Sequence, residues 1–237
     1  MDQKEMKELV GRTAVDRLVK SGMKLGLGTG STAMPAVRRL GELMRDGMLK
    51  DIKAVPTSFQ TIIECEKWGI PLFSLNSIEI GGELDLTIDG ADEVDRNNYC
   101  TKGGGGALLV EKITAYNSRD FAIVVDELKI VDDLGLKFAV PIEVVPEARL
   151  TVWRALEQMG AQPQLREALR KAGPVITEHA NLLLDIRFSH AVDPRIMEAE
   201  IARIPGVVET GFFSYLGTKL RPMVFIGRST GEVEFRE

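Results

Sequence analysis

Short apolar segments typical of strands alternate with amphipathic segments typical of helices along residues 1–140. Apolar residues recur at helical spacing from Met6 to Leu18, so we expect the chain to open with a helix over residues 3–20. The same pattern predicts further helices over residues 32–48, 59–68 and 107–116, and strands over residues 23–28, 52–56, 72–74, 84–88 and 121–125. Alternation of this kind predicts a mostly parallel sheet with helices on both faces.

The pattern changes after Val140, where Pro141 and Pro146 bracket a short predicted strand. The elements predicted after it are a helix over residues 147–160, strands over 175–177 and 182–187, a helix over 193–204 and a strand over 207–213. Together these elements have the order βαββαβ, which is typical of a ferredoxin-like unit. Two last strands, over residues 223–226 and 233–235, are expected to return to the first sheet.

The sequence therefore predicts an α/β fold in which a Rossmann-like, mostly parallel sheet domain carries an inserted, smaller α+β ferredoxin-like domain. We expect the sheet domain to comprise residues 1–142 and 220–237, and the inserted domain to comprise residues 143–219. A chain of 237 residues is long enough for one medium domain with a smaller companion.

Composition limits the partners that the chain is expected to have. The net charge is −5 and no run of Lys and Arg occurs, so we expect no nucleic-acid partner, because phosphate backbones are held by clustered cations. The N-terminal stretch lacks the apolar run of a signal peptide, and no segment approaches about 18 consecutive apolar residues, so no membrane partner is expected. Cys65 and Cys100 have no CxxC spacing and are interpreted as free thiols in the reducing cytoplasm.

The first candidate loop has the sequence GLGTGST, ends at Thr32 and lies between a predicted strand and a predicted helix. Glycines allow close backbone approach, and a helix N-terminus offers N–H groups to an anion. With the hydroxyls of Thr29, Ser31 and Thr32 beside the backbone of Gly30, the loop suits a phosphate monoester. The spacing differs from the dinucleotide pattern G-x-G-x-x-G, and no Gly-Lys-Ser/Thr follows for a nucleotide P-loop. A tight glycine turn before a capped helix is the structural alternative.

The second candidate loop is an acidic turn of Asp89, Gly90, Ala91 and Asp92 after a predicted strand. Open α/β sheets bind ligands at the C-terminal ends of their strands, so these two carboxylates are placed to accept hydrogen bonds from sugar hydroxyls. No histidine or further spaced acid completes a recognisable metal site, and the EF-hand pattern is not met. An acidic turn that only caps the next segment is the alternative.

In the third candidate loop, Lys102 precedes four consecutive glycines at the start of a predicted helix. Consecutive glycines cost folding entropy, so we expect the backbone N–H groups of Gly103, Gly104 and Gly105 to be open to a ligand. Glu111 lies one turn into the helix among apolar residues, and the residues four before and four after it are alanines, which cannot pair with it. The alternative for this glutamate is a solvated acid on a helix surface.

Taken together, the three loops supply the parts of an enediolate isomerase. Moving a carbonyl between C1 and C2 of a sugar requires a base for a carbon-bound proton, and positive charge or donors where the oxyanion develops. Glu111 and Lys102 fit these roles. His179 and His190 fall in the predicted insertion and are interpreted as structural or surface residues. We expect the three loops to converge on one pocket the length of a pentose phosphate.

Six stretches span nearly the whole chain: GLGTGSTA, PTSFQT, DLTIDGADEVD, KGGGGALLVEK, LGLKFAVPIEVVP and IPGVVETGFF. In this combination they resemble the ribose-5-phosphate isomerase A family. The resemblance implies interconversion of D-ribose 5-phosphate and D-ribulose 5-phosphate through a cis-enediolate, a step of the pentose phosphate pathway, without metal, nucleotide or other cofactor. It also implies a homo-oligomer, either a dimer or a tetramer.

The same resemblance implies a role for individual residues. Glu111 is expected to be the proton-transferring base, and Lys102 to help stabilise the enediolate. Asp89 and Asp92 are expected to contact the sugar and assist ring opening. Residues expected to bind the substrate are Thr29, Gly30, Ser31, Thr32, Asp89, Gly90, Ala91, Asp92, Lys102, Gly103, Gly104, Gly105 and Lys137.

Two other functions fit part of the pattern. An amino-sugar phosphate deaminase would have the same broad architecture and would release ammonia from glucosamine 6-phosphate. A non-catalytic sugar-phosphate sensor would keep the phosphate loop and need no base. Such sensors usually carry a DNA-binding module, and the acidic chain has no basic patch for one.

Overall fold

The computed structural model describes residues 1–220 and 222–237, which form two compact units. Unit 1 comprises Met1–Ala91, Val110–Lys129 and Thr218–Glu237, and unit 2 comprises Asp92–Leu109 and Ile130–Gly217. The domain boundaries expected from the sequence describe domains that each fold independently. These boundaries stay a prediction. Residue 221, within the expected sheet domain, lies outside the described residues.

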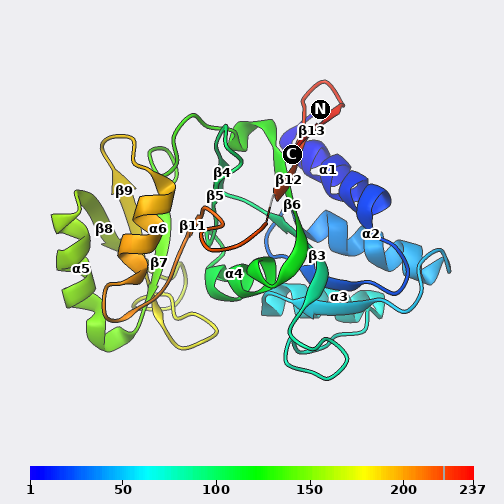
Figure 1. Cartoon of the computed structure of the whole chain (residues 1–237), viewed down its shortest axis with the longest axis horizontal. Coiled ribbons are helices and arrows are strands. Elements are labelled where there is room, and N and C mark those ends of the chain that lie inside the picture. Colours follow the sequence, from blue (N-terminus) through cyan, green and yellow to red (C-terminus); the bar gives the residue numbers. More distant parts are fainter. Residues whose placement is uncertain (221) are drawn as a thin grey trace. The chain divides into compact units, whose positions relative to one another are not determined.

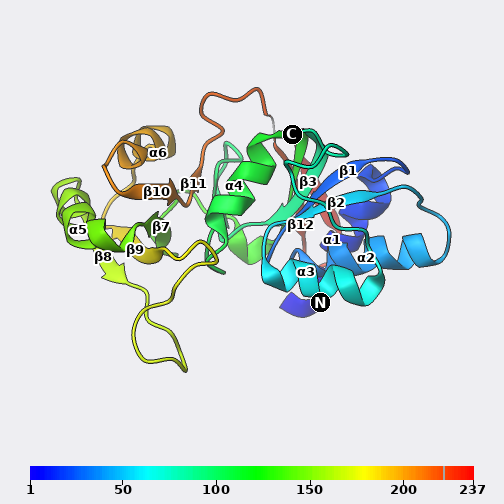
Figure 2. The same cartoon turned by 90° about the horizontal axis from the view of Figure 1, so that it is seen from below.

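Unit 1 is built on one six-stranded sheet (Figures 1 and 2). Its helices are α1 (Gln3–Leu18), α2 (Met34–Arg45), α3 (Phe59–Trp68), most of α4 (Leu108–Tyr116) and the short 3-10 helix η1 (Glu127–Lys129). Its strands are β1 (Lys24–Leu27), β2 (Lys53–Pro56), β3 (Leu84–Gly90), β6 (Ser118–Asp126), β12 (Pro222–Gly227) and β13 (Val233–Arg236). The strand order is β13-β12-β6-β3-β1-β2, and every neighbouring pair is parallel except β12 with β13. The predicted mostly parallel sheet is confirmed.

Alternate side chains of β3 show that helices cover both faces of this sheet. Leu86 and Ile88 belong to the same buried cluster as Val10 of α1 and residues of α2. The hydroxyl of Thr87, between them, donates to the carbonyl of Thr114 in α4 over 3.4 Å. Since successive strand residues point to opposite faces, α4 covers the face opposite to α1 and α2.

Unit 2 contains the predicted ferredoxin-like arrangement. Its elements are β4 (Glu93–Val94), β5 (Cys100–Thr101), β7 (Val140–Val144), η2 (Pro146–Ala148), α5 (Arg149–Gln158), β8 (Ala161–Leu165), β9 (Leu182–Phe188), α6 (Pro194–Ala202), β10 (Val207–Thr210) and β11 (Phe212–Phe213). Four strands form an antiparallel sheet in the order β10-β7-β9-β8, and the chain order from β7 to β10 is βαββαβ. A second, three-stranded sheet has the order β11-β5-β4.

Two predicted strands are wrong, and β4, β5 and β8 were missed. Residues 72–74 and 175–177 form only isolated bridges, through Leu72 and Ile176. The strand that pairs with β9 is instead β8, whose sequence AQPQL has a central proline. A proline cannot donate to a neighbouring strand, but β8 lies at the edge of its sheet, where that loss is tolerated. The predicted strand over residues 207–213 divides at Gly211 into β10 and β11, which belong to different sheets.

Local signals explain where several helices begin and end. Asp2 and Glu5 form a reciprocal capping box at the start of α1. Ser58 caps α3 by accepting the N–H of Thr61, and Gly69 ends the same helix in the left-handed conformation. Within the described residues, no helix is both long enough and apolar enough to cross a membrane.

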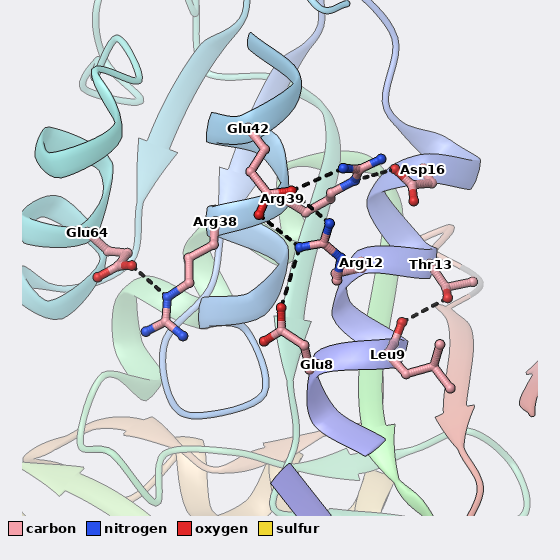
Figure 3. Close-up of polar contacts among 9 residues, drawn as sticks. All are labelled: Glu8, Leu9, Arg12, Thr13, Asp16, Arg38, Arg39, Glu42 and Glu64. Carbon is pink, nitrogen blue, oxygen red and sulfur yellow. Dashed lines mark hydrogen bonds and ion pairs between the residues drawn. The ribbon is translucent and has the colours of Figure 1, made fainter. Parts of the chain in front are cut away.

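An ion-pair network joins α1 to α2 (Figure 3). Nη1 and Nη2 of Arg12 donate to the two carboxylate oxygens of Glu42 over 2.9 and 2.7 Å, and Nη1 of Arg39 donates to the same carboxylate over 3.0 Å. The hydrogen bonds from Arg12 and Arg39 lower the pKa of Glu42 from its ordinary 4.5 to about 2, and the hydrogen bond from Arg12 is the largest cause. The network therefore contributes its full stabilisation at pH values above the pKa that Glu42 has in the unfolded chain. This stabilisation is lost as the pH falls from 4.5 towards 2.

We expect Glu42→Gln to lower the free energy of unfolding at neutral pH by about 1 kcal/mol, because the pair is bidentate but partly solvated. The difference from the unsubstituted protein should shrink as the pH is lowered to about 3, because Glu42 then loses its advantage over the neutral amide. Urea unfolding at both pH values measures this. Glu83→Gln is the matched control, since Glu83 is 75% exposed and its ion pair with Arg119 is long, at 4.0 Å. An equal loss at both pH values would contradict the electrostatic account.

Candidate active site

The predicted site residues belong to both units. Unit 1 contains Thr29, Gly30, Ser31, Thr32, Asp89, Gly90, Ala91 and Glu111. Unit 2 contains Asp92, Lys102, Gly103, Gly104, Gly105 and Lys137.

Asp89 joins the first two predicted loops in unit 1. It lies near the end of β3 and is completely buried. Its Oδ1 accepts the N–H of Thr29 over 3.0 Å and the N–H of Gly90 over 2.7 Å. A Cβ atom on Gly28 would lie 1.9 Å from this same oxygen, so only glycine fits there. The carboxylate that was expected to contact a sugar holds the first predicted loop in place in this structure.

The hydroxyl of Thr29 lies in a cluster of hydroxyls from the end of β2 and the start of α3. Thr29 Oγ1 is 2.7 Å from Thr57 Oγ1, and it donates to Ser58 Oγ over 2.6 Å. Thr61 Oγ1 donates to the carbonyl of Gly28 over 2.7 Å. Thr29 was expected to donate to a phosphate, whereas in this structure its hydroxyl fastens the loop to a neighbouring segment. Thr57, Ser58 and Thr61 lie in the stretch PTSFQT but were not among the residues predicted for the site.

The outer side of the first loop carries a cation that the sequence analysis missed. Lys7 Nζ in α1 donates to the exposed hydroxyl of Ser31 over 3.0 Å. Gly30 has a φ of +94°, which favours glycine, and its N–H donates to the side-chain oxygen of Gln60 over 2.8 Å. A lysine, a hydroxyl and the start of α2 together suit an anion. Lys7 gave no signal in the sequence because it is one of several charged residues of α1.

The remaining predicted residues of the first two loops lie close to one another in unit 1. Thr32 is 7% exposed, and a Cβ atom on Gly90 would be 3.5 Å from its Cβ. Ala91 is partly buried and is the last residue of the first segment of unit 1.

Glu111 is buried, with 4% of its surface exposed, in the first turn of α4. The interpretation of this residue as a solvated surface acid is therefore wrong. Removing a carboxylate from water is costly, so its burial needs a compensating role or environment. The position of Glu111 in the first turn of α4 supplies part of this compensation, because the N-terminal end of a helix favours negative charge.

The second and third predicted loops meet in unit 2. Asp92 Oδ2 accepts the N–H of Gly104 over 2.7 Å, and the N–H of Asp92 donates to the carbonyl of Thr101 over 2.8 Å. A Cβ atom on Gly104 would lie 2.5 Å from Asp92 Oδ1, so a side chain there would displace the carboxylate. Gly104 and Gly105 are exposed. The N–H of Gly104 is nevertheless hydrogen-bonded to Asp92, so the expectation that this N–H is open to a ligand is not met.

Lys102 begins this glycine loop and is 2% exposed. Its N–H donates to the carbonyl of Gly211 over 2.9 Å, and its Nζ lies 5.8 Å from the ring centroid of Phe213. An ammonium over an aromatic face is attracted by the ring electrons. Gly103, which follows, has a φ of +96°, and a Cβ atom there would be 2.8 Å from Leu108 Cβ.

Lys137 is exposed, and its carbonyl accepts a hydrogen bond from Arg187 Nη1 over 2.7 Å. In the described part of unit 2, no hydrogen bond or ion pair links its side chain to the glycine loop. Its contact with the substrate stays a prediction.

Both cysteines have buried, free thiols. Burial raises the pKa of Cys65 to about 12, so this thiol stays neutral. Across residues 1–220 and 222–237, no three side chains of His, Cys, Asp or Glu gather in a way that could hold a metal ion.

Comparison with known proteins places the whole chain in one family. The family profile described as Ribose 5-phosphate isomerase A (phosphoriboisomerase A) matches residues 53–231. The chain is 53% identical to the Ribose-5-phosphate isomerase A of Treponema denticola over 241 residues, which is 99% of each chain. It is 51% identical to that of Treponema pallidum over 243 residues, covering 100% of this chain and 94% of the relative.

Solved structures agree with the sequence comparison. A D-ribose-5-phosphate isomerase in complex with phospho-erythronic acid matches with a TM-score of 0.93 and 39% identity, covering 100% of both chains. The ribose 5-phosphate isomerase A of Methanocaldococcus jannaschii matches with a TM-score of 0.90 and 40% identity, again over 100% of both chains. The chain described here belongs to the ribose 5-phosphate isomerase A family.

Proposed function

We propose that this chain interconverts D-ribose 5-phosphate and D-ribulose 5-phosphate, with Glu111 as the base that moves the proton. Relatives that match the chain over nearly its whole length support the reaction. The observation that carries the residue assignment is the burial of the Glu111 carboxylate in the first turn of α4. A buried carboxylate is poorly hydrated, and it is a stronger base toward a carbon-bound proton than a solvated one.

The proposed reaction proceeds through a cis-enediolate. The carboxylate of Glu111 takes the proton from C2 of the open-chain aldose, and the electron pair of the C–H bond forms the C1–C2 double bond as the C1 carbonyl becomes an oxyanion. The ammonium of Lys102 stabilises this negative charge. Glu111 then returns the proton to C1 while the O2 proton passes to O1 and C2 becomes the ketone. No atom is gained or lost.

The remaining residues hold the two ends of the sugar phosphate. The loop of Thr29 to Thr32, with Lys7 beside Ser31, binds the phosphate. Asp89 and Asp92 contact sugar hydroxyls and assist ring opening, and the backbone of Gly103 to Gly105 faces the reacting end. We further propose that the protein acts in the cytoplasm as a homodimer or homotetramer.

Formation of ribulose 5-phosphate from ribose 5-phosphate, followed in a coupled assay, tests the proposed function directly. The deaminase alternative is not favoured, because the relatives that cover the whole chain are isomerases. Ammonia released from glucosamine 6-phosphate, without ribulose 5-phosphate formed, would reverse this conclusion.

We expect Glu111→Gln to lower kcat by about two to four orders of magnitude and to change KM by less than about threefold, because the amide keeps the shape but cannot accept the proton. Exchange of the C2 proton with deuterated water, followed by NMR, should fall by a similar factor. Glu66→Gln is the matched control, since Glu66 is an exposed glutamate of unit 1. Near-normal turnover in Glu111→Gln would remove this residue from the base role.

Lys102→Ala should lower kcat by about two orders of magnitude and affect KM much less, because charge on the enediolate develops only after binding. Steady-state kinetics measure both constants. Lys171→Ala, at an exposed lysine of unit 2, should leave both unchanged. An effect of Lys102→Ala that is confined to KM would make Lys102 a binding residue only.

Lys7→Met should raise KM for ribose 5-phosphate about tenfold with little change in kcat, because it removes the cation beside Ser31 but nothing near the reacting carbons. Inhibition by inorganic phosphate should weaken by a similar factor. Lys4→Met, at an exposed lysine of the same helix, serves as the control. Unchanged phosphate inhibition in Lys7→Met would show that Lys7 lies outside the phosphate site.

A further inference from the structure

Arg166 reaches the glycine loop from the far end of β8. It directly follows this strand, and its Nη1 donates to the carbonyl of Gly103 and to the carbonyl of Gly104, each over 3.1 Å. These are two consecutive carbonyls of the loop that begins at Lys102. All of these residues belong to unit 2.

Asp185 fixes the guanidinium of Arg166 in this position. Nε of Arg166 donates to Asp185 Oδ2 over 2.8 Å, and Nη2 donates to Oδ1, so the pair is bidentate. Only 17% of the Arg166 side chain and 22% of the Asp185 side chain are exposed. Asp185 lies in β9, and the N–H of Arg166 donates to the carbonyl of Leu183 in the same strand over 2.9 Å. The arginine is therefore anchored by its backbone and by its side chain.

The contacts of Arg166 determine which way the peptide groups of the loop point. In a trans peptide, the C=O and the N–H point in opposite directions. The peptide that joins Gly103 to Gly104 is held at both ends, with its C=O on Arg166 and its N–H on Asp92. The next peptide has its C=O on Arg166, so the N–H of Gly105 points away from the guanidinium.

A run of glycines would not keep these directions by itself. Glycine populates left-handed and right-handed conformations almost equally, so each peptide of the run can turn over at small cost. A guanidinium that binds two consecutive carbonyls removes this freedom. It also draws electrons towards the carbonyl oxygens and so makes the opposite N–H groups stronger donors.

We propose that Arg166, held by Asp185, is a positioning residue that keeps the N–H group of Gly105 turned towards the substrate during isomerisation, while the N–H of Gly104 stays on Asp92. This inference rests on the proposed function, because it takes the glycine loop to face the reacting end of the sugar phosphate. Arg166 acts through the loop and not on the substrate itself. The sequence around Arg166, with Leu165 before it and Glu167 after it, contains no motif that indicates this role.

The test compares two inhibitors in the full-length protein. Phospho-erythronic acid carries a carboxylate where the enediolate develops negative charge, whereas inorganic phosphate has no such group. Arg166→Met should lower kcat for ribose 5-phosphate about 10- to 100-fold, the size of effect expected from small misplacement of catalytic groups. It should weaken inhibition by phospho-erythronic acid at least about tenfold and leave inhibition by inorganic phosphate within about twofold, because Lys7 and Ser31 lie in unit 1.

Two conservative variants separate positioning from folding. Arg166→Lys keeps the charge but lacks the fork that binds two carbonyls and a carboxylate together, so it should restore part of the loss in kcat. Asp185→Asn should also lower kcat and weaken inhibition by phospho-erythronic acid, but by smaller factors than Arg166→Met. Arg195→Met is the matched control, because Arg195 forms an ion pair with Asp193 in the same unit. Thermal unfolding of every variant gives the fraction of folded protein, so that kcat can be expressed per folded molecule.

Three outcomes would overturn the inference. The first is an unchanged kcat in Arg166→Met. The second is equal weakening of both inhibitors. The third is a lower melting temperature with normal kcat per folded molecule, which would make the arginine structural only. Absence of isomerase activity in the unsubstituted protein would instead reject the proposed function, and calorimetric binding of phospho-erythronic acid would then still test whether Arg166 orders the loop.

Discussion

One carboxylate oxygen, Oδ1 of Asp89, fixes the part of unit 1 that binds the phosphate in our proposal. It is buried at the end of β3 and accepts two backbone N–H groups, one from the loop after β1 and one from its own strand. Hydrogen bonds to an ionised group are stronger than neutral ones, and away from water they lose little to competition. The loop conformation, the glycine at position 28 and the hydroxyl cluster around Thr29 all depend on this oxygen.

The fold could be predicted wherever hydrophobic periodicity was strong. The helix α3 begins and ends at the predicted residues, and the βαββαβ order of unit 2 is also as predicted. Prediction failed for β8, because Pro163 and two glutamines hide a strand that needs hydrogen bonds on only one side. It failed for β4 and β5 because two-residue strands have no periodicity to detect.

The candidate site loops could be identified in the sequence because glycines and charged residues stand together in continuous stretches, and their role in binding stays a prediction. Contacts that form only in the folded chain could not be predicted in this way. Lys7 and Arg166 are single charged residues among many, and each becomes distinctive only through the one loop that it touches. Glu111 is the reverse case, because a resemblance in sequence implies its role, which stays a proposal, while only the structure could show its burial.

The order of strands in unit 1 has a consequence for synthesis of the chain. The strand β12 pairs with β6, yet the chain reaches β12 only after all of unit 2 has been made. Until then, one edge of β6, with the apolar run from Phe121 to Val125, has no partner strand from this chain. An unpaired apolar edge invites pairing with other chains. On the ribosome, the sheet of unit 1 therefore stays incomplete until the last strands have been made, and this edge of β6 is open to such pairing until then.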